Sequence, residues 1–301
     1  MDLIVADWGT SRFRAFRVAD ERIIDRVVSD EEGISELRPG QHAEVFRRHC
    51  GPWLEAWPGA PVLLVGMVGS REGWREAPYV PCPAGPDEVA AALVPVELGS
   101  GRRAHIVPGL LCEPEPGAVD VCRGEEILAL GSGVTDGLAV MPGTHSKWMS
   151  LEGGRVTRFA SAMTGEMYAL LLDHSMIGRP ATTPADEAGF ERGLAAAERN
   201  AGGRRVGLLH LLFGARAAVV AGRLPAGQLA PYLSGLLTGD EVNAALSAGQ
   251  RPERVTVVQH RERARFYEAA LARHRISAEV LDPEPALIRG VTRVAAALAR
   301  P

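Results

Sequence analysis

A short strand, a Gly-Thr turn and a returning strand occur twice in this chain, and this duplication constrains the fold more than any other feature. Residues 3–6 are apolar and residues 12–18 alternate between apolar and polar, with Trp8-Gly9-Thr10-Ser11 between them. The pattern returns about 135 residues later, around Gly143-Thr144-His145-Ser146. Because self-similarity indicates a duplicated structural unit, we expect two related α/β domains.

The length of the chain agrees with two domains, since a typical domain has roughly 100–200 residues and this chain has 301. Residues 131–137 are rich in glycine and interrupt the periodic pattern. We therefore predict an N-terminal domain over 1–133 and a C-terminal domain over 134–301.

The remaining elements follow from periodicity and capping residues. Residues 61–69 form an apolar run typical of a central strand, and the proline-rich residues 78–86 predict a loop. Asp120 precedes residues 121–130, which predict a helix with Asp120 as its N-cap. Further strands are expected at 104–108 and 254–259, and helices at 41–57, 166–173, 186–200, 207–223, 225–248, 264–274 and 285–299.

Composition excludes several functional classes. A formal net charge of −4 gives no general attraction to nucleic acid or to an anionic membrane. The four cysteines, Cys50, Cys82, Cys112 and Cys122, show no spacing typical of a zinc site. The first residues carry no signal-peptide pattern, and no apolar run is long enough to span a bilayer. We expect a cytoplasmic protein.

The first turn has the composition of a phosphate site. Gly9 permits close approach of the backbone, and successive N–H groups of a turn can hold an anion, with Thr10 and Ser11 adding hydroxyl donors. Asp7, at the end of the preceding strand, is suited to hold Mg²⁺ through water. The alternative is an ordinary hairpin, which uses the same residue types.

The second turn offers the same groups in Gly143, Thr144, His145 and Ser146. It is followed by Lys147, the single lysine of a chain that otherwise uses arginine. An ammonium group beside a phosphate site stabilises charge on the transferred phosphoryl group, so we predict that role for Lys147. His145 is expected to orient its neighbours by hydrogen bonding. Two such turns would clamp a triphosphate between two domains.

If the bound phosphate is transferred to a hydroxyl group, as in a kinase, a carboxylate is needed near that hydroxyl to accept its proton. Asp120 is one candidate and Glu125 is another; helix capping and a solvated helix face are their respective structural alternatives. Arg123 lies between them and would pair with these acids or bind a substrate carboxylate.

Ser70, Arg71 and Trp74 follow the predicted central strand and would suit a small hydroxy acid by hydrogen bonding, charge pairing and apolar contact. Glu166 opens a predicted helix. It is either a further substrate contact or a complement to the helix dipole.

Taken together, these segments resemble the 2-keto-3-deoxygalactonokinase family of the sugar kinase, Hsp70 and actin superfamily. The matching stretches span most of the chain, in family order: DWGTSRFRAF (7–16), GMVGSREGWREAPYVPCPAG (66–85), DVCRGEE (120–126), MPGTHSKW (141–148), SAMTGEMYALL (161–171) and YLSGLLTGDE (232–241). The resemblance implies an α/β fold of two ribonuclease-H-like (actin-like ATPase) domains, with mixed sheets flanked by helices and a cleft between the domains. It also implies that the terminal helix 285–299 crosses between them.

The activity that the resemblance implies is ATP-dependent phosphorylation of 2-keto-3-deoxygalactonate at its terminal hydroxyl, in galactonate breakdown. Residues 7–11 then match the first phosphate motif and residues 143–146 the second. Asp120 falls where related kinases carry the catalytic base, so it is preferred to Glu125. ATP and Mg²⁺ are the implied cofactors, and the sugar acid and ATP are the implied partners.

The sequence departs from the family at Gln259-His260, where a Gly-Ser-Pro turn is usual after the nucleotide-binding strand. This leaves two other readings open: a kinase for another sugar acid, and a non-catalytic sensor of sugar acids. The apolar run at 208–213 is compatible with a homodimer face and equally with core packing.

Overall fold

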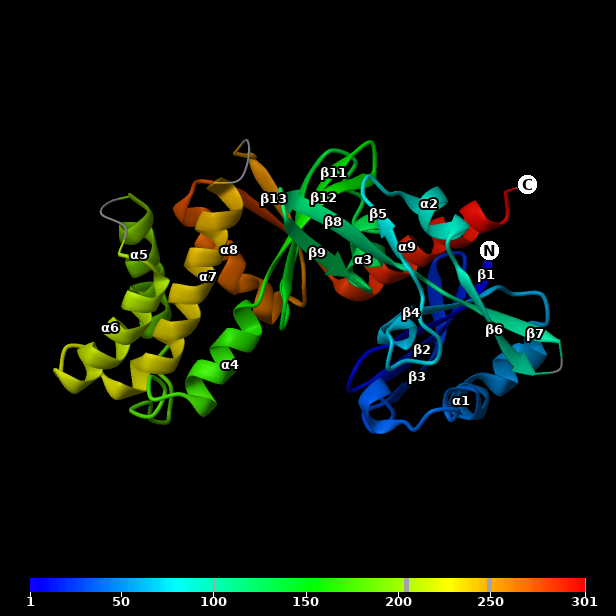
Figure 1. Cartoon of the computed structure of the whole chain (residues 1–301), viewed down its shortest axis with the longest axis horizontal. Coiled ribbons are helices and arrows are strands. Elements are labelled where there is room, and N and C mark those ends of the chain that lie inside the picture. Colours follow the sequence, from blue (N-terminus) through cyan, green and yellow to red (C-terminus); the bar gives the residue numbers. More distant parts are fainter. Residues whose placement is uncertain (100, 203–205, 248–250, 301) are drawn as a thin grey trace. The chain divides into compact units, whose positions relative to one another are not determined.

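The computed structural model describes residues 1–99, 101–202, 206–247 and 251–300 (Figure 1). The chain divides into two compact units. Unit 1 comprises residues 1–139, 149–159 and 281–301, and unit 2 comprises residues 140–148 and 160–280. The division falls within four strands, so each unit is assembled from separate stretches of the sequence.

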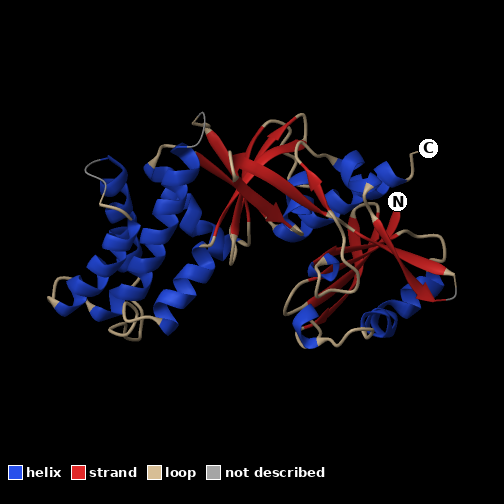
Figure 2. Cartoon of the chain, in the orientation of Figure 1, coloured by secondary structure: helices blue, strands red, loops and turns tan. Residues whose placement is uncertain are grey.

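Unit 1 is built on a β-sheet, and Figure 2 draws the strands of the chain in red. This sheet has six strands in the order β3-β2-β1-β4-β7-β6. Its first three strands form an antiparallel meander that begins with the two predicted strands, and β4 pairs parallel with both β1 and β7. The strands are β1 (Asp2–Trp8), β2 (Phe13–Ala19), β3 (Arg22–Ser29), β4 (Val62–Gly66), β6 (Val94–Gly99) and β7 (Arg102–Ile106). The apolar strand predicted at 61–69 is β4, which lies inside the sheet and is buried along its whole length.

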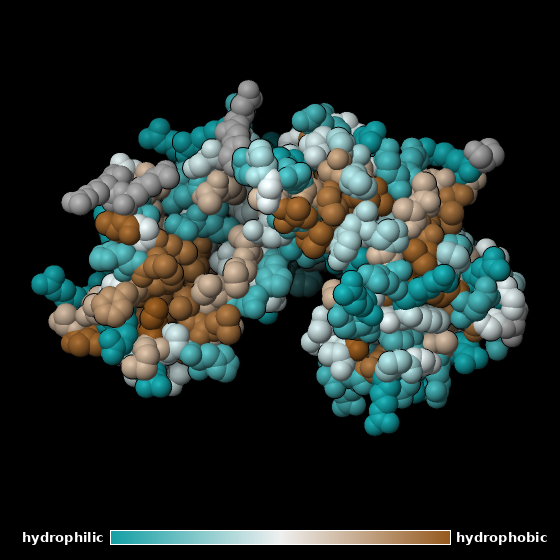
Figure 3. Space-filling model, viewed as in Figure 1, coloured by the Kyte–Doolittle hydropathy of each residue, from teal (hydrophilic) through white to brown (hydrophobic). Residues whose placement is uncertain are grey.

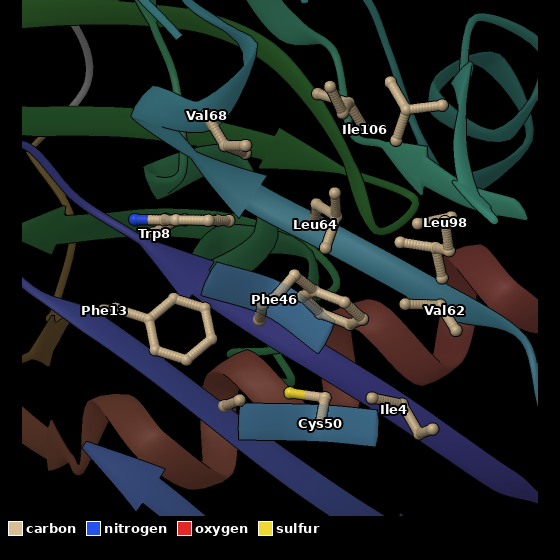
Figure 4. Packing of buried hydrophobic residues seen from close by; sticks show 14 of the residues in the cluster. Ile4, Trp8, Phe13, Phe46, Cys50, Val62, Leu64, Val68, Leu98 and Ile106 are labelled. Atoms are coloured by element: carbon tan, nitrogen blue, oxygen red, sulfur yellow. The ribbon is translucent and has the colours of Figure 1, made fainter. Parts of the chain in front are cut away.

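One face of this sheet packs against α1 (His42–Ala56). Side chains that alternate along β1 and β4, such as Ile4, Trp8 and Leu64, meet Phe46 and Cys50 of the helix in one buried cluster (Figure 4). Burial of this area stabilises the hairpin whose turn is residues 9–12. The end of β1 and the start of β2, which flank the turn, are therefore held by the packing of the sheet against α1.

A second sheet repeats the strand order of the first. It has five strands in the order β12-β11-β10-β13-β14, which is again a meander followed by two strands on the side of its first strand. They are β10 (Gly137–Met141), β11 (Ser146–Glu152), β12 (Arg155–Ala162), β13 (Arg254–Val258) and β14 (Ser277–Leu281). The duplicated fold predicted from the two Gly-Thr turns is thus confirmed at the level of sheet topology.

Unit 2 adds the helices of the second half of the chain. They are α4 (Thr164–His174), α5 (Ala188–Gly202), α6 (Leu208–Val220), the 3₁₀ turn η3 (Ala226–Gln228), α7 (Leu229–Ser247) and α8 (Arg261–Arg273). Leucines and alanines of α4–α7 form a separate core. Figure 3 shows apolar residues gathered on this helical part, and Leu209, Phe213 and Val220 of α6 are exposed. The homodimer stays a prediction.

The region 78–130 differs from expectation. The proline-rich segment contains β5 (Tyr79–Pro81), and α2 (Pro86–Ala91) begins at its end. A small sheet of order β5-β8-β9 includes β8 (Gly109–Glu115) and β9 (Ala118–Cys122). Two 3₁₀ turns, η1 (Ile34–Glu36) and η2 (Met67–Gly69), complete unit 1 together with α3 (Glu125–Leu130) and α9 (Pro283–Leu298).

The predicted helix 121–130 with Asp120 as its N-cap is wrong. Asp120 lies within β9, opposite Cys112 of β8, and the helix begins only at Glu125. Gly124 is the N-cap and has a φ of 108°, a backbone conformation that favours glycine and that no α-helix contains. The chain therefore turns sharply at Gly124, which brings Arg123 and Glu125 to the start of α3.

A glycine contact holds α3 against α9. A Cβ atom on Gly290 would lie 2.0 Å from the carbonyl oxygen of Ile127, and one on Gly131 would lie 1.9 Å from that of Ala286. The two backbones thus approach so closely that a side chain at either glycine would overlap the other backbone. This contact fixes the position of the residues at the start of α3. In the described part of the chain, none of the helices is long and apolar enough to cross a membrane.

Candidate active site

The first Gly-Thr turn is held from behind by a short segment of the same unit. Gly9 N–H donates to the Arg12 carbonyl at 2.9 Å, which closes the turn. The carbonyl oxygens of Gly9 and Thr10 accept hydrogen bonds from Ile34 N–H (3.0 Å) and Ser35 N–H (2.9 Å). A Cβ on Gly33 would come within 2.2 Å of the Thr10 carbonyl, so only glycine allows this approach. Thr10 and Ser11 remain exposed.

Asp7 is the penultimate residue of β1, and its carboxylate forms an ion pair with Arg14, which lies opposite it on β2. Both line a cavity of about 170 Å³ in unit 1. The cavity is lined by residues of β1, β2, the end of β4, the start of α3 and the start of α9: Asp7, Gly9, Arg14, Val65, Gly66, Met67, Arg123, Gly124, Glu125, Leu128, Pro283, Glu284 and Leu287. The fold therefore brings the predicted residues Asp7, Gly9 and Arg123 together with Glu125.

Two adjacent carboxyl groups at the start of α3 have different environments. Glu125 is half-buried, lines the cavity and accepts a hydrogen bond from Arg123 N–H at 3.2 Å. Glu126 is fully buried and accepts from Gly124 N–H at 2.7 Å. Burial, with a smaller contribution from the neighbouring Glu125, raises the pKa of Glu126 to about 8. Glu126 is thus largely protonated at neutral pH.

Asp120, the preferred candidate for the catalytic base, does not line this cavity. It is half-buried in β9, in register with Cys112. The cavity is reached instead by the residues that follow the turn at Gly124. The sequence offers Asp120 and Glu125 as candidates for the catalytic base. Of these two, only Glu125 lines the same cavity as Asp7.

The five residues predicted to contact a sugar acid do not all share one environment. Arg123 donates from Nη2 to the Ala77 carbonyl at 2.8 Å, and its guanidinium lies 4.4 Å from the ring centre of Tyr79. Its Nε and Nη1 atoms and the Ser70 hydroxyl are buried and have no hydrogen-bond partner among the described residues. Gly69 lies against the guanidinium, since a Cβ there would be 2.9 Å from Nη1. These buried donors without a partner make Arg123 and Ser70 candidates for binding an anion.

Arg71 and Trp74 do not share that environment. The Arg71 side chain is 82% exposed and lies 3.8 Å from the exposed Glu76. Trp74 stacks on His42, with ring centres 6.1 Å apart, and packs against the core of unit 1. Packing accounts for Trp74, and an exposed surface pair accounts for Arg71.

The second Gly-Thr turn is braced in the same way as the first. A Cβ on Gly165 would lie 2.4 Å from the Gly143 carbonyl, and Glu166 N–H donates to the Thr144 carbonyl at 3.0 Å. The Glu166 carboxylate also contacts His145 Nε2. The first helical turn of α4 is therefore fixed against residues 143–145. Glu166 contacts this Gly-Thr turn through both its backbone N–H and its carboxylate.

Ser146 and Lys147 point to opposite faces of β11, because successive side chains of a strand alternate. Ser146 is buried and lies 2.9 Å from the Tyr267 hydroxyl. Lys147 is 5% exposed and is not among the residues that line the cavity described next. Its predicted role beside a phosphate group stays a prediction.

A larger cavity, of about 400 Å³, lies in unit 2 beside the second turn. It is lined by residues of the turn, α4, α7, the end of β13 and α8: Pro142, Gly143, Thr144, Thr164, Gly165, Tyr168, Ser234, Leu237, Thr238, Gln259, Arg263, Phe266 and Tyr267. Gln259 donates from Nε2 to the Pro142 carbonyl at 2.7 Å, so this departure from the family pattern links β13 to the second turn. Sequence reasoning missed the contributions of α7 and α8, which carry no phosphate-binding signal of their own.

Comparison with known proteins gives consistent matches over nearly the whole chain. The family described as 2-keto-3-deoxy-galactonokinase matches residues 7–294. The chain is 33% identical to the 2-dehydro-3-deoxygalactonokinase of Escherichia coli (strain K12), over 98% of each chain. It is similar to a crystal structure assigned as a 2-dehydro-3-deoxygalactonokinase protein from Sinorhizobium meliloti, with a TM-score of 0.85, 28% identity and coverage of 99% of this chain and 100% of that one.

More distant structures share only the fold. The activator of 2-hydroxyisocaproyl-CoA dehydratase from Clostridium difficile superposes with a TM-score of 0.51 at 14% identity, over 99% of this chain and 96% of that one. The predicted actin-like arrangement of mixed sheets and flanking helices is thereby confirmed. With the match across residues 7–294 and the full-length similarity to the Escherichia coli enzyme, the chain belongs to the 2-keto-3-deoxy-galactonokinase family.

Proposed function

We propose that the chain catalyses ATP-dependent phosphorylation of 2-dehydro-3-deoxy-D-galactonate at its terminal (6-) hydroxyl, in galactonate catabolism. Family membership supports the activity. The observation that carries it in the structure is the cavity of unit 1, where Asp7, Arg123 and Glu125 meet at the first Gly-Thr turn. This set supplies an oxygen donor for a metal, a cation for a carboxylate and a proton acceptor.

The nucleotide is proposed to bind in the 400 Å³ cavity of unit 2. Its size lies within the usual range for small-molecule sites. Tyr168 and Phe266 supply aromatic surface, and Thr144 and Thr164 supply hydroxyl groups. The first turn of α4 lines the cavity, and the N-terminus of a helix favours phosphate. These groups fit an adenine nucleotide.

The cation is proposed to be Mg²⁺, held by Asp7 through water. Carboxylate oxygen suits a hard divalent ion, and Asp7 and Glu125 line one cavity. Cys122 also offers a ligand atom near Glu125 and Glu126, but a thiol and a largely protonated carboxyl group are poor ligands for Mg²⁺. When bound, the ion would neutralise charge on the phosphate groups.

The carboxylate of the sugar acid is proposed to bind at Arg123 and Ser70. A buried donor without a partner is costly, and ligand oxygens would satisfy the two guanidinium nitrogens and the hydroxyl together. Arg123 also lines the cavity that contains Glu125. The acid would thus be oriented with respect to the proton acceptor.

Glu125, in preference to Asp120, is proposed to accept the proton of the attacking hydroxyl. The new oxygen–phosphorus bond forms as the bond between the γ-phosphorus of ATP and the bridging oxygen breaks, and ADP leaves with that oxygen. Glu125 lines the cavity, whereas Asp120 lies in β9 and is not among the lining residues. Within each unit, the residues of the turn are proposed to donate to phosphate oxygens: Thr10 and Ser11 in unit 1, and Gly143 and Thr144 in unit 2. These turns are held rigid by the backbone contacts of Gly33 and Gly165, so little reorganisation accompanies transfer.

A coupled assay that follows ADP release with ATP, Mg²⁺ and 2-dehydro-3-deoxy-D-galactonate tests the function directly. We expect turnover that requires the sugar acid, ATP and Mg²⁺ together. Turnover with a different sugar acid only would support phosphoryl transfer and rule out 2-dehydro-3-deoxy-D-galactonate as the substrate. Calorimetric binding of the sugar acid without binding of MgATP would contradict the enzyme and indicate a sensor.

The assignment of the base is tested by the matched substitutions Glu125→Gln and Asp120→Asn. Because general-base catalysis contributes about 10²–10⁴-fold, Glu125→Gln should lower kcat by at least about 100-fold and leave both KM values within a few-fold. Asp120→Asn should retain most of the kcat. The reverse pattern in steady-state kinetics would restore Asp120 as the base.

The site for the substrate carboxylate is tested by Arg123→Met with Arg71→Met as its control. Loss of a charge-assisted contact should raise the KM for the sugar acid by on the order of 100-fold, with the KM for MgATP little changed. Arg71→Met should behave as wild type, because that side chain is mostly exposed. If Arg71→Met gives the larger loss of sugar-acid affinity, the exposed loop is the binding site instead.

A further inference from the structure

A buried carboxylate lies behind the cavity of unit 2 without lining it. Glu241 of α7 is 6% exposed, and burial raises its pKa. Its Oε1 atom accepts from Trp148 Nε1 at 2.8 Å and from the Tyr267 hydroxyl at 2.9 Å. Its Oε2 atom lies 2.8 Å from the same Tyr267 hydroxyl and 3.3 Å from Ser146 Oγ. The Thr164 side chain is a further hydrogen-bond partner.

The partners of Glu241 come from α4, α8 and β11, and two of these elements, α4 and α8, also line the cavity. Tyr267 of α8 and Thr164 of α4 line it themselves. Ser146 begins β11 directly after the second Gly-Thr turn, whose residues Gly143 and Thr144 line the cavity. On α7, Leu237 and Thr238 line the cavity one turn before Glu241. One carboxylate therefore joins every helical wall of the cavity to the turn.

Stability alone does not account for this arrangement. Burying a carboxylate is costly, and well-packed apolar side chains of similar volume often stabilise a core as well or better. An apolar residue would not fix the direction of the Tyr267 hydroxyl or of Ser146. A network in which several donors converge on one acceptor holds its members in a single geometry. Such fixation matters where a ligand needs preformed walls.

We propose that Glu241 is a positioning residue for the nucleotide cavity. Its carboxylate holds the Tyr267 ring, Thr164 and the start of β11 in place, so that the cavity and the Gly143–Thr144 turn are formed before the nucleotide binds. This inference rests on the proposed function, because it requires the nucleotide to occupy this cavity. It assigns to α7 a role that is separate from contact with the ligand.

The test compares Glu241→Gln and Tyr267→Phe with wild type in the full-length enzyme. Glutamine keeps the shape of glutamate but turns one acceptor oxygen into a donor that faces other donors. Phenylalanine keeps the ring at the cavity and removes the hydroxyl that both Glu241 oxygens share. Both substitutions should raise the KM for MgATP by about tenfold to a hundredfold and leave the KM for the sugar acid within about twofold.

Asp240→Asn is the matched control. Asp240 precedes Glu241 on α7 but lines a different hollow, with Asn200 and Asn243. We expect this variant to keep the wild-type KM for MgATP. A purely structural role of Glu241 would lower thermal stability without separating the two KM values, so the separation is the decisive readout.

Calorimetry with Mg²⁺ and a nonhydrolysable ATP analogue separates failure of this inference from failure of the proposed function. If the wild-type enzyme binds the analogue and folded Glu241→Gln and Tyr267→Phe bind it equally well, the positioning role is overturned. If Glu241→Gln does not fold, Tyr267→Phe decides by the same criterion. Absence of binding to the wild-type enzyme would overturn the proposed nucleotide site and this inference with it.

Discussion

In each unit, a glycine passes so close behind a Gly-Thr turn that a Cβ atom would overlap the turn's backbone. Gly33 lies behind Thr10 and Ser11, and Gly165 lies behind Gly143. In both cases the next residues donate backbone hydrogen bonds to carbonyl oxygens of the turn. The turn is thus held by main-chain contacts, while its threonine side chain stays exposed. Every step of the proposed chemistry depends on turns that keep this shape.

Around these braced turns, the two units differ in what they add. Unit 1 surrounds its turn with Asp7, Arg123 and Glu125, brought together by the sharp bend at Gly124 and by the close contact of α3 with α9. Unit 2 surrounds its turn with helices, aromatic rings and hydroxyl groups. A duplicated framework thus carries a charged cavity in one copy and a less charged, larger cavity in the other. This difference agrees with one copy binding the acidic acceptor and the other the nucleoside.

The sequence predicted the framework well, because alternation of apolar residues and two similar turns are local signals. It failed at residues 118–130, where Asp120 resembles a helix cap and the strand β9 is short. Only the pairing of β9 with β8 and the positive φ at Gly124 decide that region, and neither is visible locally. Glu241 was missed for a related reason: its partners Ser146, Trp148 and Tyr267 are remote in sequence and meet only in the folded chain.

The central claim is that the nucleotide binds in unit 2 against the second braced turn. Hydrogen–deuterium exchange of the full chain, with Mg²⁺ and a nonhydrolysable ATP analogue added or omitted, tests it most directly. The account predicts slower exchange of the backbone at residues 143–147, 164–168 and 259–267, with little change in α6 at 208–220. Slower exchange confined to other segments, or none at saturating analogue, would contradict it.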